Sequence, residues 1–358
     1  MKRLIFFELR KIVSKRLAFI AFIGILLFSV LISFSSYQNK YAFAPNVGQG
    51  FGKTAVEIDK KVAAKYEGLL TDEKIQQMMS DFAPTEDLHG LNAVYLYQNS
   101  MQSDTFARFS DQSGNWNGLR VSDVFGDEEI KIGYVDGWLS TSKNMVRTFV
   151  VLAFAVIIIV APVFSSEYEG VDNIILTSKY GKTKCATAKV IASTIIAIFT
   201  TSLVVAFHLV FAFTFYGTDG LDCSILFAPS DYVESFIPFN ITCGMLLKYQ
   251  ILLAFTCTLS ITGITLLISA ISKNQIVALV AAMAFLLFPV LIPITESSPL
   301  FRLVGLFPIY HVLAISLLSV EQMGNGMLYA IWATPVALLF FGIGTVISQG
   351  MFAKHQVS

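Results

Sequence analysis

Long apolar runs recur along this chain and are separated by shorter polar stretches. Six of the runs are 19 to 26 residues long, which matches the ~20 residues that a helix needs to cross ~30 Å of hydrocarbon. The six predicted transmembrane helices are 17–36, 145–164, 190–215, 246–271, 276–294 and 328–347. The pattern predicts an all-α polytopic membrane protein.

A further apolar segment lies near 300–319, before the last predicted span. It follows a turn that contains Pro299, and Gly305 and Pro308 interrupt it. Such breaks favour a re-entrant segment of two short helices over a full crossing. A seventh span stays an alternative, and it would move the C-terminal tail to the other side.

The first 16 residues have the pattern of an amphipathic helix. Ile5, Leu9 and Ile12 recur at spacings of four and three, and basic residues occupy much of the remaining surface. This pattern is typical of an interfacial helix on the inner leaflet. The apolar run after it is longer than the seven to fifteen residues of a signal peptide, so we expect 17–36 to be retained as the first span.

Residues 37–144 have the composition of a water-soluble domain, with fifteen acidic and ten basic residues. We predict a mainly helical extracellular domain here. Its predicted helices are 54–66, 71–82 and 88–98, and 130–135 is a candidate strand. Thr71 is the predicted N-cap of the second helix. Four large aromatic residues fit a domain core better than a ligand surface; they are Tyr95, Tyr97, Trp116 and Trp138.

Composition excludes a soluble protein, since 55% of the 358 residues are hydrophobic, 14% are charged and the mean hydropathy is +0.66. Soluble domains carry about 25% charged residues. Basic and acidic residues are 25 each, so net charge gives no reason to expect a nucleic-acid partner.

The positions of the basic residues predict the orientation. Twelve of them lie before the first span, between spans two and three, or in the other segments of that side. The loop 217–245 on the opposite side has none. The positive-inside rule then places both termini in the cytoplasm, and we expect a multi-pass protein of a bacterial-type plasma membrane.

Enzyme signatures are absent from the sequence. Two Gly-Lys-Thr tripeptides, at 52–54 and 181–183, lack the earlier glycine of a phosphate-binding loop. The four histidines have no metal-ligand spacing, so we expect no metal site. His208 and His311 lie in apolar stretches, where they could line a transport pathway or make an inter-helix hydrogen bond.

Cys223 and Cys243 share a predicted outer loop. A disulfide between them and two free thiols are both open, depending on how oxidising the exterior is.

The most informative segment is the predicted cytoplasmic loop 165–189, in which acidic residues come first and basic residues last around a short apolar core. It resembles the coupling helix of ABC-2-type permeases, the membrane subunits of ATP-binding-cassette exporters. The residues that match in order are Glu167, Gly170, Leu176, the basic turn 178–182 and Lys189. The chain departs from that family at Ser178-Lys179, where a proline is common.

The resemblance implies a division of labour between subunits. The residues that would contact the ATPase subunit are Glu167, Glu169, Gly170, Asn173, Leu176 and Lys179. ATP and Mg would bind to the partner ATPase subunits and no cofactor to this chain, which would pair with a second permease in the lipid bilayer. It would not be an enzyme itself, and peptides, drugs, lipids and ions are all open as substrates.

Two other classes of function remain alternatives. The chain could be a membrane-anchored sensor or assembly protein whose outer domain binds a ligand such as an antimicrobial peptide. A secondary transporter is a weaker hypothesis, because the predicted spans contain almost no acidic residues.

Overall fold

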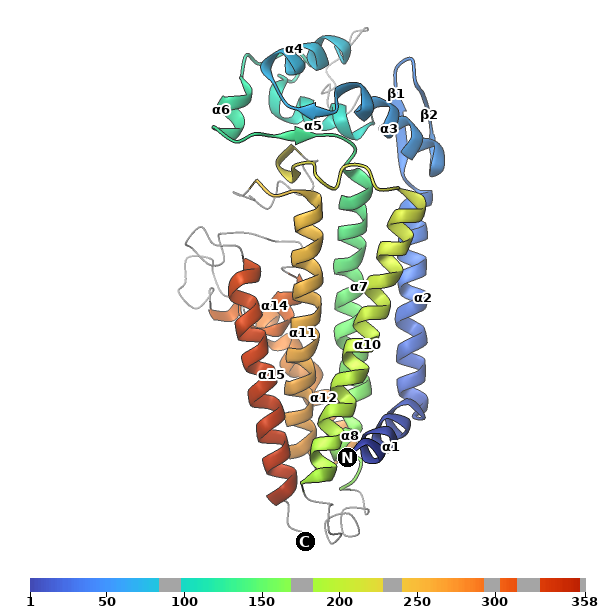
Figure 1. Ribbon diagram of the computed structural model, residues 1–358, viewed down its shortest axis with the longest axis vertical. Helices are drawn as coiled ribbons and strands as arrows, with labels where there is room; N and C mark the ends of the chain where they lie inside the picture. The colour runs from blue at the N-terminus through green and yellow to red at the C-terminus, as the bar shows by residue number, and fades with distance from the viewer. Residues whose placement is uncertain (84–97, 169–182, 228–239, 293–302, 314–328, 355–358) are drawn as a thin grey trace. The chain divides into compact units, whose positions relative to one another are not determined.

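The structure is a computed structural model that describes residues 1–83, 98–168, 183–227, 240–292, 303–313 and 329–354. Most of these residues are helical (Figure 1). The chain forms two compact units. Unit 1 comprises Met1–Ser29, Met145–Phe207 and Tyr249–Ser358, and unit 2 comprises Val30–Asn144 and His208–Lys248.

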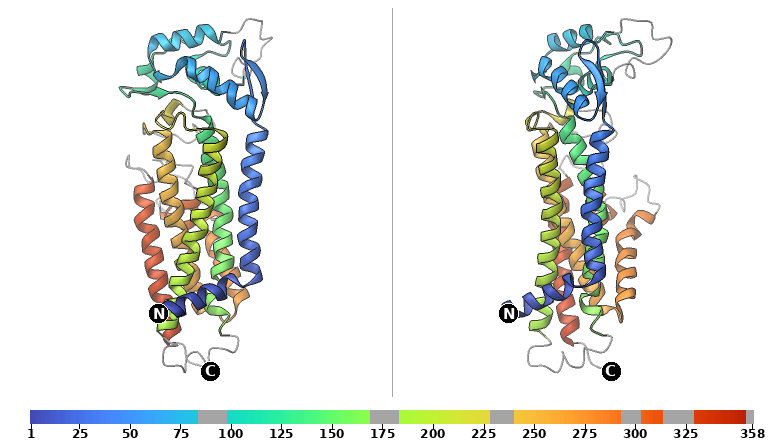
Figure 2. Two further views of the ribbon diagram at one scale, coloured as in Figure 1. Left: turned by 45° about the vertical axis from the view of Figure 1, so that its right-hand side comes forward. Right: turned by 90° about the vertical axis from the view of Figure 1, so that its right-hand side faces the viewer.

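Among the described residues, five helices are long and apolar enough to cross a membrane. They are α2 (Arg16–Gln38), α7 (Asp136–Val160) continued by the short α8 (Pro162–Ser165), α10 (Lys184–Phe215), α11 (Cys243–Ile271) and α15 (Tyr329–Lys354). The portions that belong to unit 1 lie side by side (Figures 1 and 2). The chain is therefore a mainly helical polytopic membrane protein, and each of these helices contains most of a predicted span.

The remaining apolar helix, α12 (Gln275–Leu291), has 17 residues, which is the short limit for a crossing. Asn274 caps it by accepting a hydrogen bond from the Val277 N–H at 2.9 Å. The helix ends three residues before the predicted end of the fifth span at 294. The predicted re-entrant segment contains the short α14 (Pro308–Leu313), and the rest of 300–319 lies outside the described residues.

Helix α1 (Lys2–Val13) is the amphipathic helix that the sequence predicts, and it runs crosswise to α2 and α10 (Figures 1 and 2). Glu8 and Ile12 are buried, whereas Phe6 and Phe7 are more than 60% exposed. Its apolar residues therefore divide between contacts with unit 1 and an open surface, as in a helix that lies at a membrane interface.

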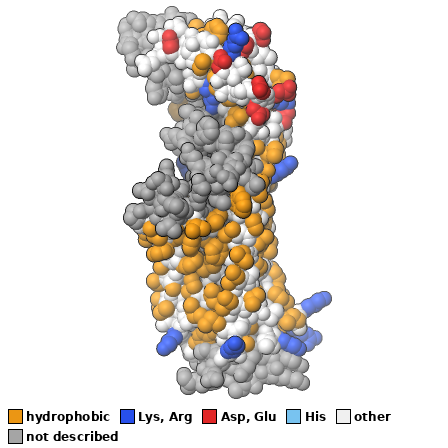
Figure 3. Space-filling view, turned by 90° about the vertical axis from the view of Figure 1, so that its left-hand side faces the viewer, with side chains coloured by type: hydrophobic (Ala, Val, Ile, Leu, Met, Phe, Trp, Pro, Cys, Tyr) orange, Lys and Arg blue, Asp and Glu red, His pale blue; other side chains and the backbone are white. Residues whose placement is uncertain are grey.

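On the face shown in Figure 3, hydrophobic side chains cover much of the long helices, and several basic side chains lie near the lower end of the view. Inside unit 1, α11 and α15 approach each other at two glycines. A Cβ on Gly263 would lie 2.6 Å from Phe341 Cα, and one on Gly344 would lie 2.3 Å from the Gly263 carbonyl carbon. Small residues permit such close packing of membrane helices.

Unit 2 contains the helices α3 (Lys53–Tyr66), α4 (Asp72–Asp81), α5 (Ser100–Phe109) and α6 (Val121–Phe125), and a 3-10 turn at Ile225–Phe227. The first two confirm predicted helices, and Thr71 caps α4 by accepting from the Lys74 N–H at 3.3 Å. The third predicted helix, 88–98, falls almost entirely outside the described residues.

Four short strands add to the helices of unit 2. β1 (Tyr41–Ala44) pairs antiparallel with β2 (Gly48–Phe51), and β3 (Gly68–Leu69) pairs with β4 (Lys131–Ile132). β4 lies within the candidate strand 130–135, whereas the hairpin β1–β2 was not predicted, because it has no long alternating pattern to reveal it. The prediction that Trp116 belongs to the core was wrong: it is 42% exposed, and its indole N–H donates to the Leu119 carbonyl at 3.0 Å.

Candidate functional site

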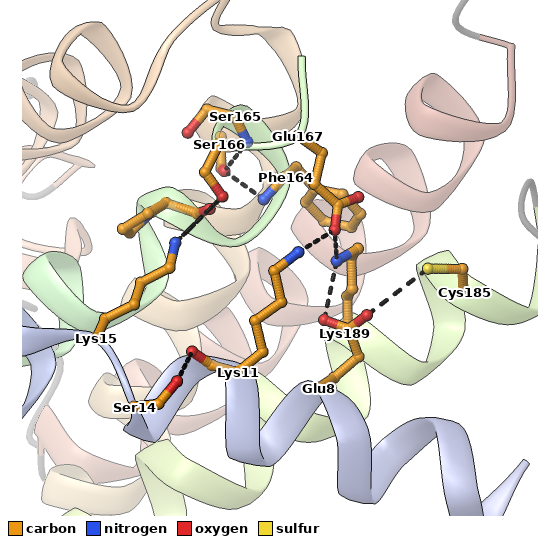
Figure 4. A network of polar contacts seen from close by, with 12 residues as sticks. Glu8, Lys11, Ser14, Lys15, Phe164, Ser165, Ser166, Glu167, Cys185 and Lys189 are labelled. Carbon is orange, nitrogen blue, oxygen red and sulfur yellow. Dashed lines mark hydrogen bonds and ion pairs between the residues drawn. The ribbon is translucent and has the colours of Figure 1, made fainter. Parts of the chain in front are cut away.

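Four charged side chains meet in unit 1, at the end that carries the N-terminus (Figure 4). Glu8 and Lys11 come from α1, Glu167 follows α8, and Lys189 lies in the first turns of α10. The Lys11 Nζ donates to Glu167 Oε1 at 2.5 Å, and the Lys189 Nζ lies 2.9 Å from Glu8 Oε2. Lys189 also donates to Glu167 Oε1, so one ammonium group joins both carboxylates. We call these four residues the ionic cluster.

The ionic cluster is largely removed from solvent. The side chains of Lys189, Glu167 and Glu8 are 0%, 1% and 5% exposed, and that of Lys11 is 34% exposed. Isolated charges are costly to bury, but two carboxylates and two ammonium groups balance here. Among the described residues, Glu167 Oε2 has no hydrogen-bond partner, so the charges of the cluster are balanced more completely than its hydrogen bonds are.

Further polar contacts attach the cluster to its surroundings. Lys15, in the turn between α1 and α2, donates to Ser166 Oγ at 3.1 Å and to the Pro162 carbonyl at 3.3 Å. The Cys185 thiol, one turn before Lys189, contacts Glu8 Oε1 at 3.8 Å. Figure 4 shows that all these groups point into the space between α1, α8 and α10.

The break between α7 and α8 positions Glu167. Pro162 has no N–H and interrupts the backbone ladder, and the hydroxyl of Ser269 on α11 fills the gap. It accepts from the N–H groups of Phe164 and Ser165 at 3.0 and 3.1 Å and donates to the Ala161 carbonyl at 2.6 Å. The chain just before Glu167 is thus fixed to α11.

The cluster brackets the segment 169–182. Glu167 lies two residues before this segment, and Cys185 and Lys189 follow it. The described residues on both sides of this segment are therefore tied to the same helix, α1, by buried contacts. A displacement of either end would have to break ion pairs or move α1.

The predicted ATPase-contact residues divide into two groups. Glu169, Gly170, Asn173, Leu176 and Lys179 lie outside the described residues. Glu167 is described, and its carboxylate faces Lys11 and Lys189 rather than an open surface. Direct contact of Glu167 with a partner stays a prediction, and in this structure its side chain ties the end of the described chain before the segment to α1 and α10.

The predicted pathway histidines are not brought together by the described contacts. His208 is buried in unit 2, where its Nδ1 lies 3.3 Å from Ser33 Oγ on α2. This contact is the inter-helix hydrogen bond that the sequence left as one alternative. His311 lies in α14, and its side chain is outside the described part of the chain.

Cys223 and Cys243 lie next to each other in unit 2. The Cys243 N–H donates to the Cys223 carbonyl at 3.0 Å, beside an antiparallel bridge between Ser224 and Thr242. Both thiols are buried and free in this structure, and burial raises the pKa of the Cys223 thiol to about 11. A disulfide between them stays one of the two alternatives that the sequence leaves open.

A second buried group of charges lies within unit 2. The Lys40 Nζ is 2.6 Å from Asp59 Oδ2 and also pairs with Asp136. Burial raises the pKa of Asp59 to about 6, although Lys40 opposes the shift. Burial raises the pKa of Asp104 well above its ordinary value, against the opposing effect of Arg108, and Asp104 Oδ1 has no hydrogen-bond partner in the part of the chain that the structure describes. We call Lys40, Asp59, Asp104 and Asp136 the acidic cluster.

Sequence reasoning missed the partners of Glu167. Glu8 is the one acidic residue before Glu57, in a segment that is otherwise basic and apolar. That isolation was a usable signal, because a lone acid on a basic interfacial helix gains little from the membrane surface. Among the described residues, no group of three or more His, Cys, Asp or Glu side chains could hold a metal ion.

Comparison of the chain with protein-family models, with curated proteins and with solved structures finds no match.

Proposed function

We propose that this chain is the membrane-spanning subunit of an ATP-driven exporter of the ABC-2 type. It would move its substrate outward and use a separate ATPase subunit as the source of energy. The single observation that carries the proposal is the ionic cluster, because it connects both ends of the segment that resembles a coupling helix to α1 and to the long helices.

The mechanism follows from these connections. A partner that pushes or turns the segment 169–182 would displace Glu167 on one side and Lys189 on the other. Both residues share their ion pairs with α1, and Ser269 ties the first side to α11. The motion would therefore reach α1, α7, α10 and α11 together, as a subunit that alternates between inward loading and outward release requires.

The proposal includes an orientation and a span count. The positive-inside rule places the end with α1 in the cytoplasm, where an ATPase subunit could reach 169–182. Helix α12 would be the sixth crossing, since 17 residues suffice for a thin or locally compressed bilayer. Unit 2 would then contribute the extracellular domain.

Purification of the tagged chain from its native membrane in mild detergent tests the proposal. We expect an ATP-hydrolysing subunit to copurify, and the substitution Gly170→Trp to abolish most of that ATPase activity by blocking close packing of the segment. Gly350→Trp is the matched control, because a Cβ at Gly350 meets nothing within 4 Å. The control should keep both the partner and the activity.

Two results would count against the exporter function. One is a well-folded chain that brings down no ATPase under conditions in which both variants are monodisperse. The other is equal activity of Gly170→Trp and Gly350→Trp, which would remove the segment from the mechanism. The first result would leave the membrane-anchored sensor as the stronger hypothesis.

A further inference from the structure

An apolar cavity lies beneath the turn between α1 and α2 in unit 1. Its volume is about 210 Å³, and its walls include Ile12, Ala18, Phe22, Ile159 and Phe199 from four different helices. The rings of Phe22 and Phe199 stack at 6.2 Å with an interplanar angle of 5° and form one wall. The cavity is thus a built feature of α1, α2, α7 and α10, and not a gap along one helix.

The walls of the cavity provide almost no hydrogen-bonding group for a water molecule. Its one polar wall residue is Thr200, whose hydroxyl donates to the Ile196 carbonyl of its own helix at 2.8 Å. A buried water needs two to four polar partners, so the cavity suits a hydrocarbon group.

The cavity adjoins a more open hollow that has a positive charge at its edge. Val13 and Phe19 line both spaces, and Arg16 and Ser14 also line the hollow. The Arg16 side chain is exposed and makes no hydrogen bond or ion pair within the described residues. Arg16 is also the first residue of α2, where the backbone N–H groups lack intrahelical acceptors and favour an anion.

The surroundings of the cavity indicate which class of molecule, with both an apolar chain and an anionic group, could bind there. Val13, Phe19 and Ile20 are each about 60% exposed, and α2 is long and apolar enough to cross a membrane. The cavity therefore faces lipid tails, and Arg16 lies at the turn where the interfacial helix meets the span, at headgroup depth.

We propose that the turn between α1 and α2 binds one anionic phospholipid, with an acyl chain in the apolar cavity and the phosphate at Arg16. The lipid would fill the space that α1, α2, α7 and α10 enclose. It would thereby hold α1 in place. This inference does not depend on the exporter function.

Native mass spectrometry of the full chain tests the site. The delipidated protein in detergent is titrated with phosphatidylglycerol and, separately, with phosphatidylcholine, and the affinity of the first lipid adduct is measured. We expect tighter binding of phosphatidylglycerol. Arg16→Gln should weaken that binding about tenfold, the loss typical of a charge-assisted hydrogen bond, and leave phosphatidylcholine binding unchanged.

Further variants distinguish binding at this site from a general attraction of anionic lipid to the basic surface of α1. Arg10→Gln removes another exposed cation of α1 that does not line the cavity, and we expect less than a twofold change. Ala18→Trp fills the cavity and should abolish the first adduct of both lipids; Ile196→Phe is the milder filling variant if Ala18→Trp does not fold.

Three outcomes would overturn the proposal. Equal weakening by Arg10→Gln and Arg16→Gln would show attraction to the basic helix as a whole. An adduct that survives filling of the cavity would place the acyl chain elsewhere. Equal affinity of the wild-type chain for the two lipids would remove the role of the negative charge.

Discussion

The two buried clusters differ in how their charges balance. In the ionic cluster of unit 1, two carboxylates face two ammonium groups, and Lys189 serves both carboxylates. In the acidic cluster of unit 2, Lys40 pairs with Asp59 and Asp136, and Asp104 is a third buried carboxylate, one of whose oxygens has no hydrogen-bond partner among the described residues. Each cluster has one partly exposed member, Lys11 at 34% and Asp136 at 25%, so the main difference lies in the number of cations.

The same kind of buried charged residue can therefore have opposite roles in one chain. A balanced buried cluster resists change, because removal of any member leaves a charge uncompensated. An excess of buried carboxylates responds to protons, because binding a proton relieves both burial and mutual repulsion. We therefore expect the ionic cluster to fix helices in place and the acidic cluster to make unit 2 sensitive to pH.

The largest expected effect comes from Lys189→Met. It leaves Glu167 and Glu8 without the cation that they share, and breaking a buried pair in this way costs about 3–5 kcal/mol. We expect a large fall in the urea concentration at which the purified protein unfolds. Lys184→Met is the matched control in the same helix, because Lys184 is exposed; an equal loss in the two variants would contradict the special place of Lys189.

The next effect concerns the pH dependence of unit 2. The pKa of Asp59 is raised to about 6 in the folded protein, and an unfolded Asp titrates near 3.9. Asp59 thus binds its proton more tightly in the folded state, so its contribution to stability is fully present below about pH 4 and is lost as pH rises through about 6. We expect unit 2 to be about 1–3 kcal/mol more stable at pH 4.5 than at pH 7.5.

Tryptophan fluorescence measures this change in the whole chain. The protein has three tryptophans, and Trp332→Phe leaves Trp116 and Trp138, both in unit 2. In that background, Asp104→Asn should flatten the pH dependence, because it removes one of the groups whose pKa is raised. A midpoint that falls on acidification would contradict the assignment of raised pKa values to this cluster.

The smallest effect should come from Lys11→Met. Lys11 is one third exposed, and Glu167 keeps its contact with Lys189 in this variant. Partly exposed pairs contribute about 0.2–1 kcal/mol, so the unfolding midpoint should shift only slightly more than in the control Lys2→Met. A loss as large as that of Lys189→Met would show that the four charges act as one unit.

The long helices were predictable because a membrane span is a local property of about 20 residues. The ends of these helices were less predictable, since α7 begins at Asp136, nine residues before the predicted span. The hairpin β1–β2 had one local signal in the sequence, which is Asn46 in its turn. This residue adopts a φ of 62°, and asparagine tolerates the left-handed region better than most residues.

The candidate site could be predicted only in part. The segment around Glu167 was found from the order of its charges, and α1 from its spacing. The pairing of Glu167 with Lys11 joins residues 156 positions apart, and no local pattern encodes such a contact. It requires knowledge of how α1, α8 and α10 pack.

Hydrogen exchange of the α1 backbone tests most directly whether the ionic cluster holds this helix to both ends of 169–182. The measurement compares the wild-type chain with Lys189→Met and Lys184→Met in the same detergent. We predict that Lys189→Met speeds exchange of the α1 amides at least about tenfold, equivalent to about 1.4 kcal/mol, and that Lys184→Met leaves it unchanged. Equal exchange of the α1 amides in all three proteins would contradict the claim that the ionic cluster holds α1 in place.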